Sequence, residues 1–131
     1  MEHERLFTLE EATNLLPQVR ELILRMQAAR READEARAEF EKLDAAHARG
    51  NGYDMKREVL ATRIVDSMKA VRQDLEALQE IGCELKDLDM GLVDFPSLRK
   101  GQVVNLCWKI DEESIGYWHS LDSGFARRQP L

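Results

Sequence analysis

The chain has 131 residues, which leaves room for one domain or for a small domain that carries an extended arm. Charged residues make up 34% and hydrophobic residues 44%, a balance that excludes a fully disordered chain and allows a modest core. The net charge of −6 comes from 19 basic and 25 acidic side chains and repels polyphosphate. Because the basic residues are not gathered into one patch, we expect no nucleic-acid partner.

The sequence offers no segment that could cross a membrane, since its longest apolar runs have three or four residues and a spanning helix needs about 20. Acidic Glu2 and Glu4 stand where a signal peptide carries basic residues, and no apolar stretch follows them. We therefore expect a cytoplasmic protein without membrane association.

Cys83 and Cys107 are the two cysteines of the chain. Two thiols cannot build a zinc framework by themselves, and in the cytoplasm they stay reduced. The simplest interpretation is that both are small apolar fillers, and we expect no cofactor.

Residues 8–82 are predicted to form a long helical hairpin. Thr8 and Glu11 fit a capping box, which starts a short first helix over 8–16. Pro17 is expected to end that helix and to begin a long one over about 17–49. Glycine-rich residues 50–52 are the expected tip, and a second long helix follows over 54–81.

Both long helices carry apolar residues at alternating steps of three and four, which is the spacing of a coiled-coil-like seam. Helices joined by a short loop fold back antiparallel, so facing positions should have residue numbers that sum to about 104, as Ala33 and Val71 do. The seams are Val19, Leu22, Met26, Ala29, Ala33, Ala36, Phe40, Leu43 and His47, and then Ala61, Ile64, Met68, Val71, Leu75 and Leu78.

Residues 83–131 are predicted to form a small antiparallel sheet of three to four strands and a C-terminal tail, so the whole chain is one α+β domain. A β-hairpin closed around Glu112-Glu113 pairs Trp108 with Tyr117 and Leu106 with His119. Alternation then places these four side chains on the face that packs on the helices. Cys107 and Trp118 fall on the opposite face.

His119 has three possible roles. On an apolar face it is most simply a core histidine, with Asp122 as its charged neighbour. Alternatively, His119 and Asp122 bind a metal with Asp94 or Cys107, although no metal-binding spacing is present. A Cys107–His119 nucleophilic dyad is disfavoured, because the two side chains are expected on opposite faces.

Several short motifs resemble a prokaryotic family known as domain of unknown function 2203. The resemblance implies a small bacterial protein of unassigned role, and it implies no activity or catalytic residues. The matching motifs are Phe7-Thr8-Leu9-Glu10-Glu11-Ala12, Leu15-Leu16-Pro17, Gly91-Leu92-Val93-Asp94-Phe95-Pro96, Leu106-Cys107-Trp108, Tyr117-Trp118-His119 and Gly124-Phe125-Ala126-Arg127-Arg128-Gln129-Pro130.

Two classes of function are compatible with the sequence, and the sequence favours the non-catalytic one. The first is a non-catalytic interaction module that binds a protein partner or forms a homodimer, because Leu16, Ile23, Leu24 and Trp118 are expected to be uncovered. The alternative is a small-ligand or metal-binding protein, or an enzyme, with its site around His119, Asp122 and Arg127, where two adjacent arginines could hold an anion. The candidate surface comprises Trp108, Tyr117, Trp118, His119, Asp122, Arg127 and Arg128.

Overall fold

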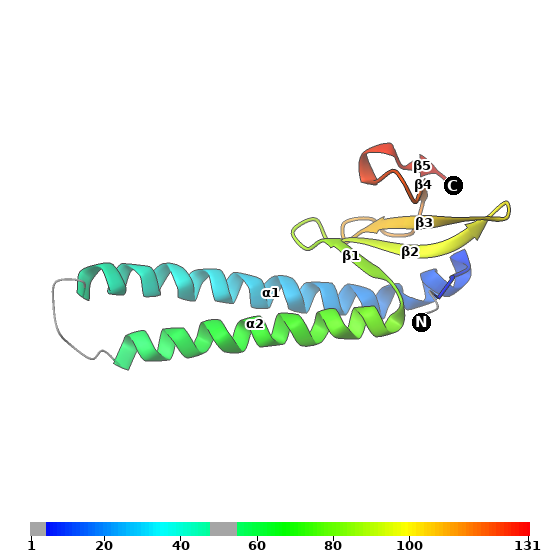
Figure 1. Cartoon of the computed structure of the whole chain (residues 1–131). Coiled ribbons are helices and arrows are strands. Elements are labelled where there is room, and N and C mark those ends of the chain that lie inside the picture. Colours follow the sequence, from blue (N-terminus) through cyan, green and yellow to red (C-terminus); the bar gives the residue numbers. More distant parts are fainter. Residues whose placement is uncertain (1–4, 48–54) are drawn as a thin grey trace.

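The computed structural model describes residues 5–47 and 55–131, and the predicted tip at 50–52 lies outside them. Within the described residues, two helices precede a five-stranded antiparallel sheet (Figure 1), so the α+β prediction is confirmed with five strands rather than three to four. The sheet has the order β1-β2-β3-β4-β5. The elements are α1 (Leu9–His47), α2 (Met55–Ile81), β1 (Glu84–Asp87), β2 (Leu92–Arg99), β3 (Gln102–Lys109), β4 (Tyr117–Ser120), the 3-10 turn η1 (Phe125–Arg127) and β5 (Gln129–Pro130).

The first helix starts at the predicted capping box. The backbone N–H of Glu11 donates to Thr8 Oγ1 at 3.0 Å, and the N–H of Thr8 donates to Glu11 Oε1 at 2.9 Å. The predicted break at Pro17 is wrong, because α1 continues through it to His47. Pro17 is exposed, whereas Leu16 and Val19 beside it are buried in the core, so packing on both sides offsets the lost backbone hydrogen bond.

The two helices pack side by side, and Leu78 of the predicted α2 seam is buried, but the other positions of that seam are half-buried or exposed. The buried positions of α2 are Leu60, Ser67, Asp74 and Leu78, whereas Met68 of the predicted seam is 42% exposed. Two of the buried positions are polar, and an apolar periodicity cannot reveal them. Ion pairs across the helices join Arg25 to Asp74, Glu32 to Arg63 and Asp44 to Arg57, so facing residue numbers sum to 99, 95 and 101 rather than 104.

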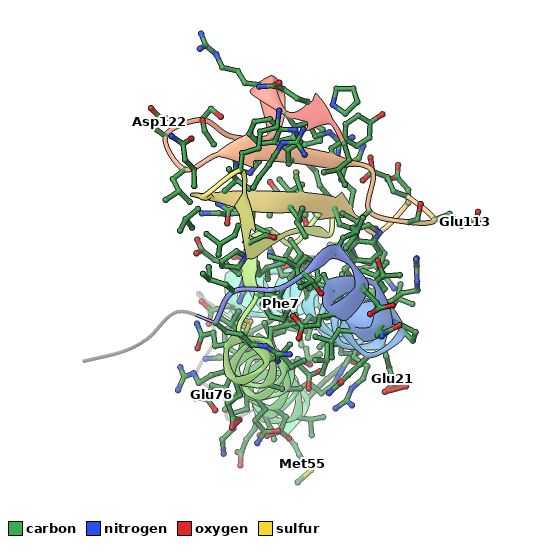
Figure 2. All side chains as sticks on the ribbon, turned by 90° about the vertical axis from the view of Figure 1, so that its right-hand side faces the viewer. Phe7, Glu21, Met55, Glu76, Glu113 and Asp122 are labelled. Carbon is green, nitrogen blue, oxygen red and sulfur yellow. The ribbon has the colours of Figure 1, made fainter. Side chains whose placement is uncertain are left out.

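The main core lies between the helices and the inner face of the sheet. This inner face carries Val93, Phe95, Leu106, Trp108 and Trp118. Figure 1 shows the sheet over one end of the helical arm, with the rest of the arm extending beyond it. Viewed along the arm, Phe7 lies where helices and sheet meet (Figure 2), and its ring contacts the ring of Phe95 edge-on at 5.5 Å between centroids.

Burial also corrects the prediction of an uncovered flank on the arm. Leu16 and Ile23 are 5% and 0% exposed and belong to the core, because the sheet covers that side of α1. Leu24 is 51% exposed, as expected. No helix among the described residues is both long and apolar enough to span a membrane.

Gly91 fixes the entry of the chain into β2. It has φ +62°, and a Cβ built there would lie 2.6 Å from Ile110. Only glycine fits this combination of positive φ and close contact. The tight turn sets the start of β2, and therefore the positions of the residues that follow it.

The β3–β4 hairpin is present, but its register differs by one residue from the prediction. Cys107 pairs with Tyr117, Leu106 with Trp118 and Asn105 with His119. The connection is a longer loop whose backbone is held at Glu112. Because the side-chain period of a strand is two, this shift moves every side chain of β4 to the other face relative to β3.

Candidate metal-binding site

The outer face of the sheet, turned away from the helices, brings Asp94, Cys107 and His119 together. Asp94 on β2 lies directly opposite Cys107 on β3. His119 on β4 lies opposite Asn105, two residues along β3 from Cys107, and therefore shares their face. All three side chains are buried, and one donor atom from each lies within 4.8 Å of the others. The expectation that Cys107 and His119 face opposite sides is wrong, for the register reason given above.

His119 has both ring nitrogens engaged. Nδ1 lies 2.8 Å from the carbonyl oxygen of Ser120, and because a carbonyl can only accept, Nδ1 carries the proton. Nε2 lies 3.1 and 3.0 Å from the two carboxylate oxygens of Asp94. In a neutral imidazole this Nε2 would present its lone pair to those oxygens, so a proton or a cation has to lie between them.

Burial is the main influence on the ionisation of Asp94, which is 2% exposed. It raises the pKa of this carboxyl, and the charge and hydrogen bond of His119 lower it by less than burial raises it. A single proton between His119 Nε2 and the carboxylate of Asp94 would satisfy both groups at these distances. A buried carboxylate is stabilised only by close positive charge.

Cys107 is a poor nucleophile in this environment. Burial, assisted by the negative charge of Asp94, raises the pKa of its thiol to about 11, although Arg128 acts in the opposite direction. Catalysis by cysteine needs a thiolate and a free base beside it, but both ring nitrogens of His119 are engaged by Ser120 and Asp94, so a Cys107–His119 dyad is not supported. A bound metal ion would change this, because coordination deprotonates a thiol outright.

The other cysteine matches its interpretation as filler. Cys83 lies in the core cluster, and its thiol contacts the carbonyl of Leu78 at 3.6 Å. Burial raises the pKa of Cys83 to about 11 as well. It takes no part in the cluster on the outer face.

Arg128 anchors the C-terminal segment over this face. Its guanidinium donates to Glu112 Oε1 at 3.1 Å and lies 3.9 Å from the ring centroid of Tyr117 and 4.6 Å from that of Phe125. A further N–H contacts Cys107 Sγ at 3.9 Å. The predicted anion site of two adjacent arginines is not formed, because Arg128 is already paired with Glu112 while Arg127 is exposed on η1.

A cavity of about 220 Å³ lies against the cluster. Asp94 and His119 form one of its walls, and the segment that follows β4 forms another. Its lining consists of Lys86, Leu92, Asp94, Asn105, His119, Leu121, Ser123, Gly124 and Phe125.

Three further residues of the predicted surface lie elsewhere. Asp122 is not the partner of His119, because its carboxylate accepts from Ser120 Oγ at 2.7 Å and lies at the margin of the sheet (Figure 2). Trp118 is not uncovered, because it packs against the core and the Arg99 guanidinium lies 4.7 Å from its ring centroid. Trp108 does not belong to a surface either, because it is fully buried in the core on the side of the sheet that faces the helices.

The sequence reasoning missed Lys86, Asn105 and Glu112. Asp94 did carry a usable signal, because it is an acidic residue between Val93 and Phe95 in an apolar strand. Such a residue needs a buried partner, and the correct hairpin register supplies His119.

The donor atoms of the cluster suit a transition metal. Zn²⁺ takes imidazole nitrogen, thiolate sulfur and carboxylate oxygen, and bond lengths near 2.0–2.3 Å place tetrahedral donors about 3.3–3.6 Å apart. Donor atoms within 4.8 Å of one another reach that spacing with small side-chain adjustments. The hydrogen bond from Nδ1 to a backbone carbonyl is the arrangement that orients a metal-binding histidine through Nε2.

Fold and site thus define a small α+β protein with a helical arm and a buried Asp–Cys–His cluster on the outer face of its sheet. The chain belongs to the family described as "Uncharacterized conserved protein (DUF2203)", which matches residues 5–131 and confirms the resemblance. A search of the curated proteins found no match, and a search of the solved structures found none either.

Proposed function

We propose that this protein binds one divalent transition metal ion, with Zn²⁺ as the best match, through Asp94, Cys107 and His119. One observation carries the proposal. His119 donates its Nδ1 proton to the Ser120 carbonyl, so the lone pair of Nε2 faces the carboxylate of Asp94. A metal ion satisfies both groups and uses the neighbouring thiol as a third ligand.

The competing explanation is a purely structural His119–Asp94 pair that shares a proton. That pair accounts for two of the three side chains and leaves Cys107 as filler. The two explanations differ in proton release. Metal binding displaces the shared proton and the thiol proton of Cys107, so we expect about two protons released per ion at neutral pH.

The proposal is tested by titrating the metal-free protein with Co²⁺, which gives thiolate-to-metal charge-transfer absorption when sulfur is a ligand. We expect saturation at one ion per chain, displacement by Zn²⁺, and loss of this absorption in Cys107→Ser. Cys83→Ala is the matched control, because Cys83 is equally buried but lies in the core away from the cluster. Weak binding without sulfur absorption, unchanged by Cys107→Ser, would contradict the proposal.

Self-association through the arm is the second candidate function. Apolar side chains are exposed along it, with Leu24 on α1 at 51% and Val59 and Val65 on α2 at 54% and 56%. A second copy, forming a homodimer, could cover them, as isologous pairing often does for extended helical hairpins. Sedimentation should give a dimer at micromolar concentration, and a monomer would refute this candidate.

We further propose that the protein acts in the bacterial cytoplasm. The family resemblance points to bacteria. A reducing compartment also keeps Cys107 available as a thiolate ligand.

A further inference from the structure

We propose that the cavity beside the cluster binds a short organic acid, whose carboxylate takes the coordination position that the three protein ligands leave open. This inference rests on the proposed metal site. Beyond the metal site, it names the class of small molecule that would bind to the ion.

Asp94 and His119 line the cavity, whereas Cys107 lies on β3 between their strands and does not line it. An ion held by all three side chains would therefore have its remaining position on the cavity side. Within the described part of the chain, the cluster contains three metal-binding side chains and no fourth. Three protein ligands with one exchangeable position is the arrangement of zinc sites that bind water or substrate.

The size of the cavity limits the ligand. Sites for drug-sized molecules have volumes of about 300–1,000 Å³. At about 220 Å³ this cavity is smaller, and it would hold a molecule of a few carbon atoms.

The lining is divided into a polar and an apolar part. Lys86 brings a positive charge, which it shares with Glu84 in an exposed ion pair, and Asn105 brings an amide that makes no side-chain hydrogen bond within the described residues. Leu92, Leu121 and Phe125 provide an apolar wall. A ligand with one anionic end and a short hydrocarbon end matches both parts.

Charge favours a carboxylate over phosphate. A divalent ion bound by the carboxylate of Asp94 and the thiolate of Cys107 forms a neutral centre, so a monoanion adds a single negative charge beside Lys86, whose ammonium group also pairs with the exposed Glu84. A dianion would keep an uncompensated charge beside Asp94, in a cavity whose lining carries one cationic side chain.

The test uses the Co²⁺-loaded full chain, titrated with acetate, propionate, butyrate and inorganic phosphate while the visible absorption of the cobalt is recorded. We expect saturable spectral changes with the carboxylates, tighter binding of propionate or butyrate than of acetate, and weaker binding of phosphate. Lys86→Gln should weaken carboxylate binding about tenfold and leave Co²⁺ affinity unchanged. Lys69→Gln is the control, because Lys69 is an exposed lysine on α2 far from the sheet's outer face.

The outcomes separate the two proposals. Failure to bind Co²⁺ through Cys107 would remove the metal site itself. If Co²⁺ binds but its spectrum responds to none of the carboxylates, or responds best to phosphate, the metal site stands and the organic-acid ligand is refuted. An equal effect of Lys86→Gln and Lys69→Gln would also refute it.

Discussion

Replacing Arg128 by Gln should release the C-terminal segment that covers the cluster. The guanidinium donates to Glu112 and contacts Cys107 Sγ, and it lies against the rings of Tyr117 and Phe125. Arg128 and Glu112 have side chains that are only 14% and 18% exposed, so solvent screens their interaction little. Glutamine keeps similar length but removes the charge and the forked geometry.

The expected magnitude follows from these contacts. Hydrogen bonds to a charged group contribute about 1.5–3 kcal/mol, and each cation–π contact about 0.5–1 kcal/mol. Because the contributions are not additive, we expect the free energy of unfolding of Arg128→Gln to fall by about 3 kcal/mol.

The effect should also depend on pH. Burial raises the pKa of Glu112, but Arg128 and the backbone N–H of Lys109 lower it by more, so the net pKa lies below the usual value. A lowered carboxyl pKa adds stability above the unfolded pKa of about 4.3, and this stability is lost as the pH falls through the folded pKa. The difference between wild type and variant should therefore be larger at pH 7 than at pH 3.

Urea unfolding at both pH values measures these differences, with Arg127→Gln as the control because Arg127 is exposed. A loss below about 1 kcal/mol, the upper range for a surface ion pair, would refute the anchoring role of Arg128. Equal losses for Arg127→Gln and Arg128→Gln would refute it as well.

Three further predictions concern the arm and the cluster. Ala33→Leu should destabilise by about 1–3 kcal/mol in denaturant unfolding, because Ala33 is 0% exposed, and a neutral result would contradict its tight packing. Pro17→Ala should stabilise by about 1–2 kcal/mol by restoring a helical hydrogen bond at an exposed site, and a lower melting temperature would contradict this. Burial raises the pKa of Asp94, so its stabilising contribution is complete below the unfolded pKa and is lost as the pH rises through the folded one. Metal-free Asp94→Asn should therefore gain stability relative to wild type as the pH rises above the unfolded pKa of about 3.9, and the opposite trend would contradict the assigned cause.

The sequence predicts those parts of the fold that depend on local chemistry. The capping box at Thr8 and most of the α1 seam follow from spacing, and the hairpin follows from its β-branched and aromatic residues. The break at Pro17 fails because tertiary packing on both sides overrides a local preference. The prediction of the α2 seam is wrong because Asp74, which is paired with Arg25, occupies a buried position, and a search for apolar residues overlooks a buried aspartate.

The site was harder to predict than the fold, because it depends on which face of the sheet the side chains of β4 occupy. Glu112 holds the loop that precedes β4: its carbonyl accepts from Trp108 Nε1 at 2.9 Å, and its carboxylate accepts from the N–H of Lys109 at 3.0 Å. These contacts shape the loop before β4, and they cannot be predicted from the periodicity of the sequence. With the observed register, His119 moves from the core face to join Asp94 and Cys107.

The metal content of the purified protein is the most direct test of the proposed ion site at Asp94, Cys107 and His119. Native mass spectrometry of wild type and His119→Gln, expressed with added zinc and purified without chelator, gives the number of ions per chain. We expect one Zn²⁺ on each wild-type chain and none on folded His119→Gln, with the fold of the variant checked by circular dichroism. Wild-type protein that is free of metal, or a variant that retains its ion, would contradict the proposed site.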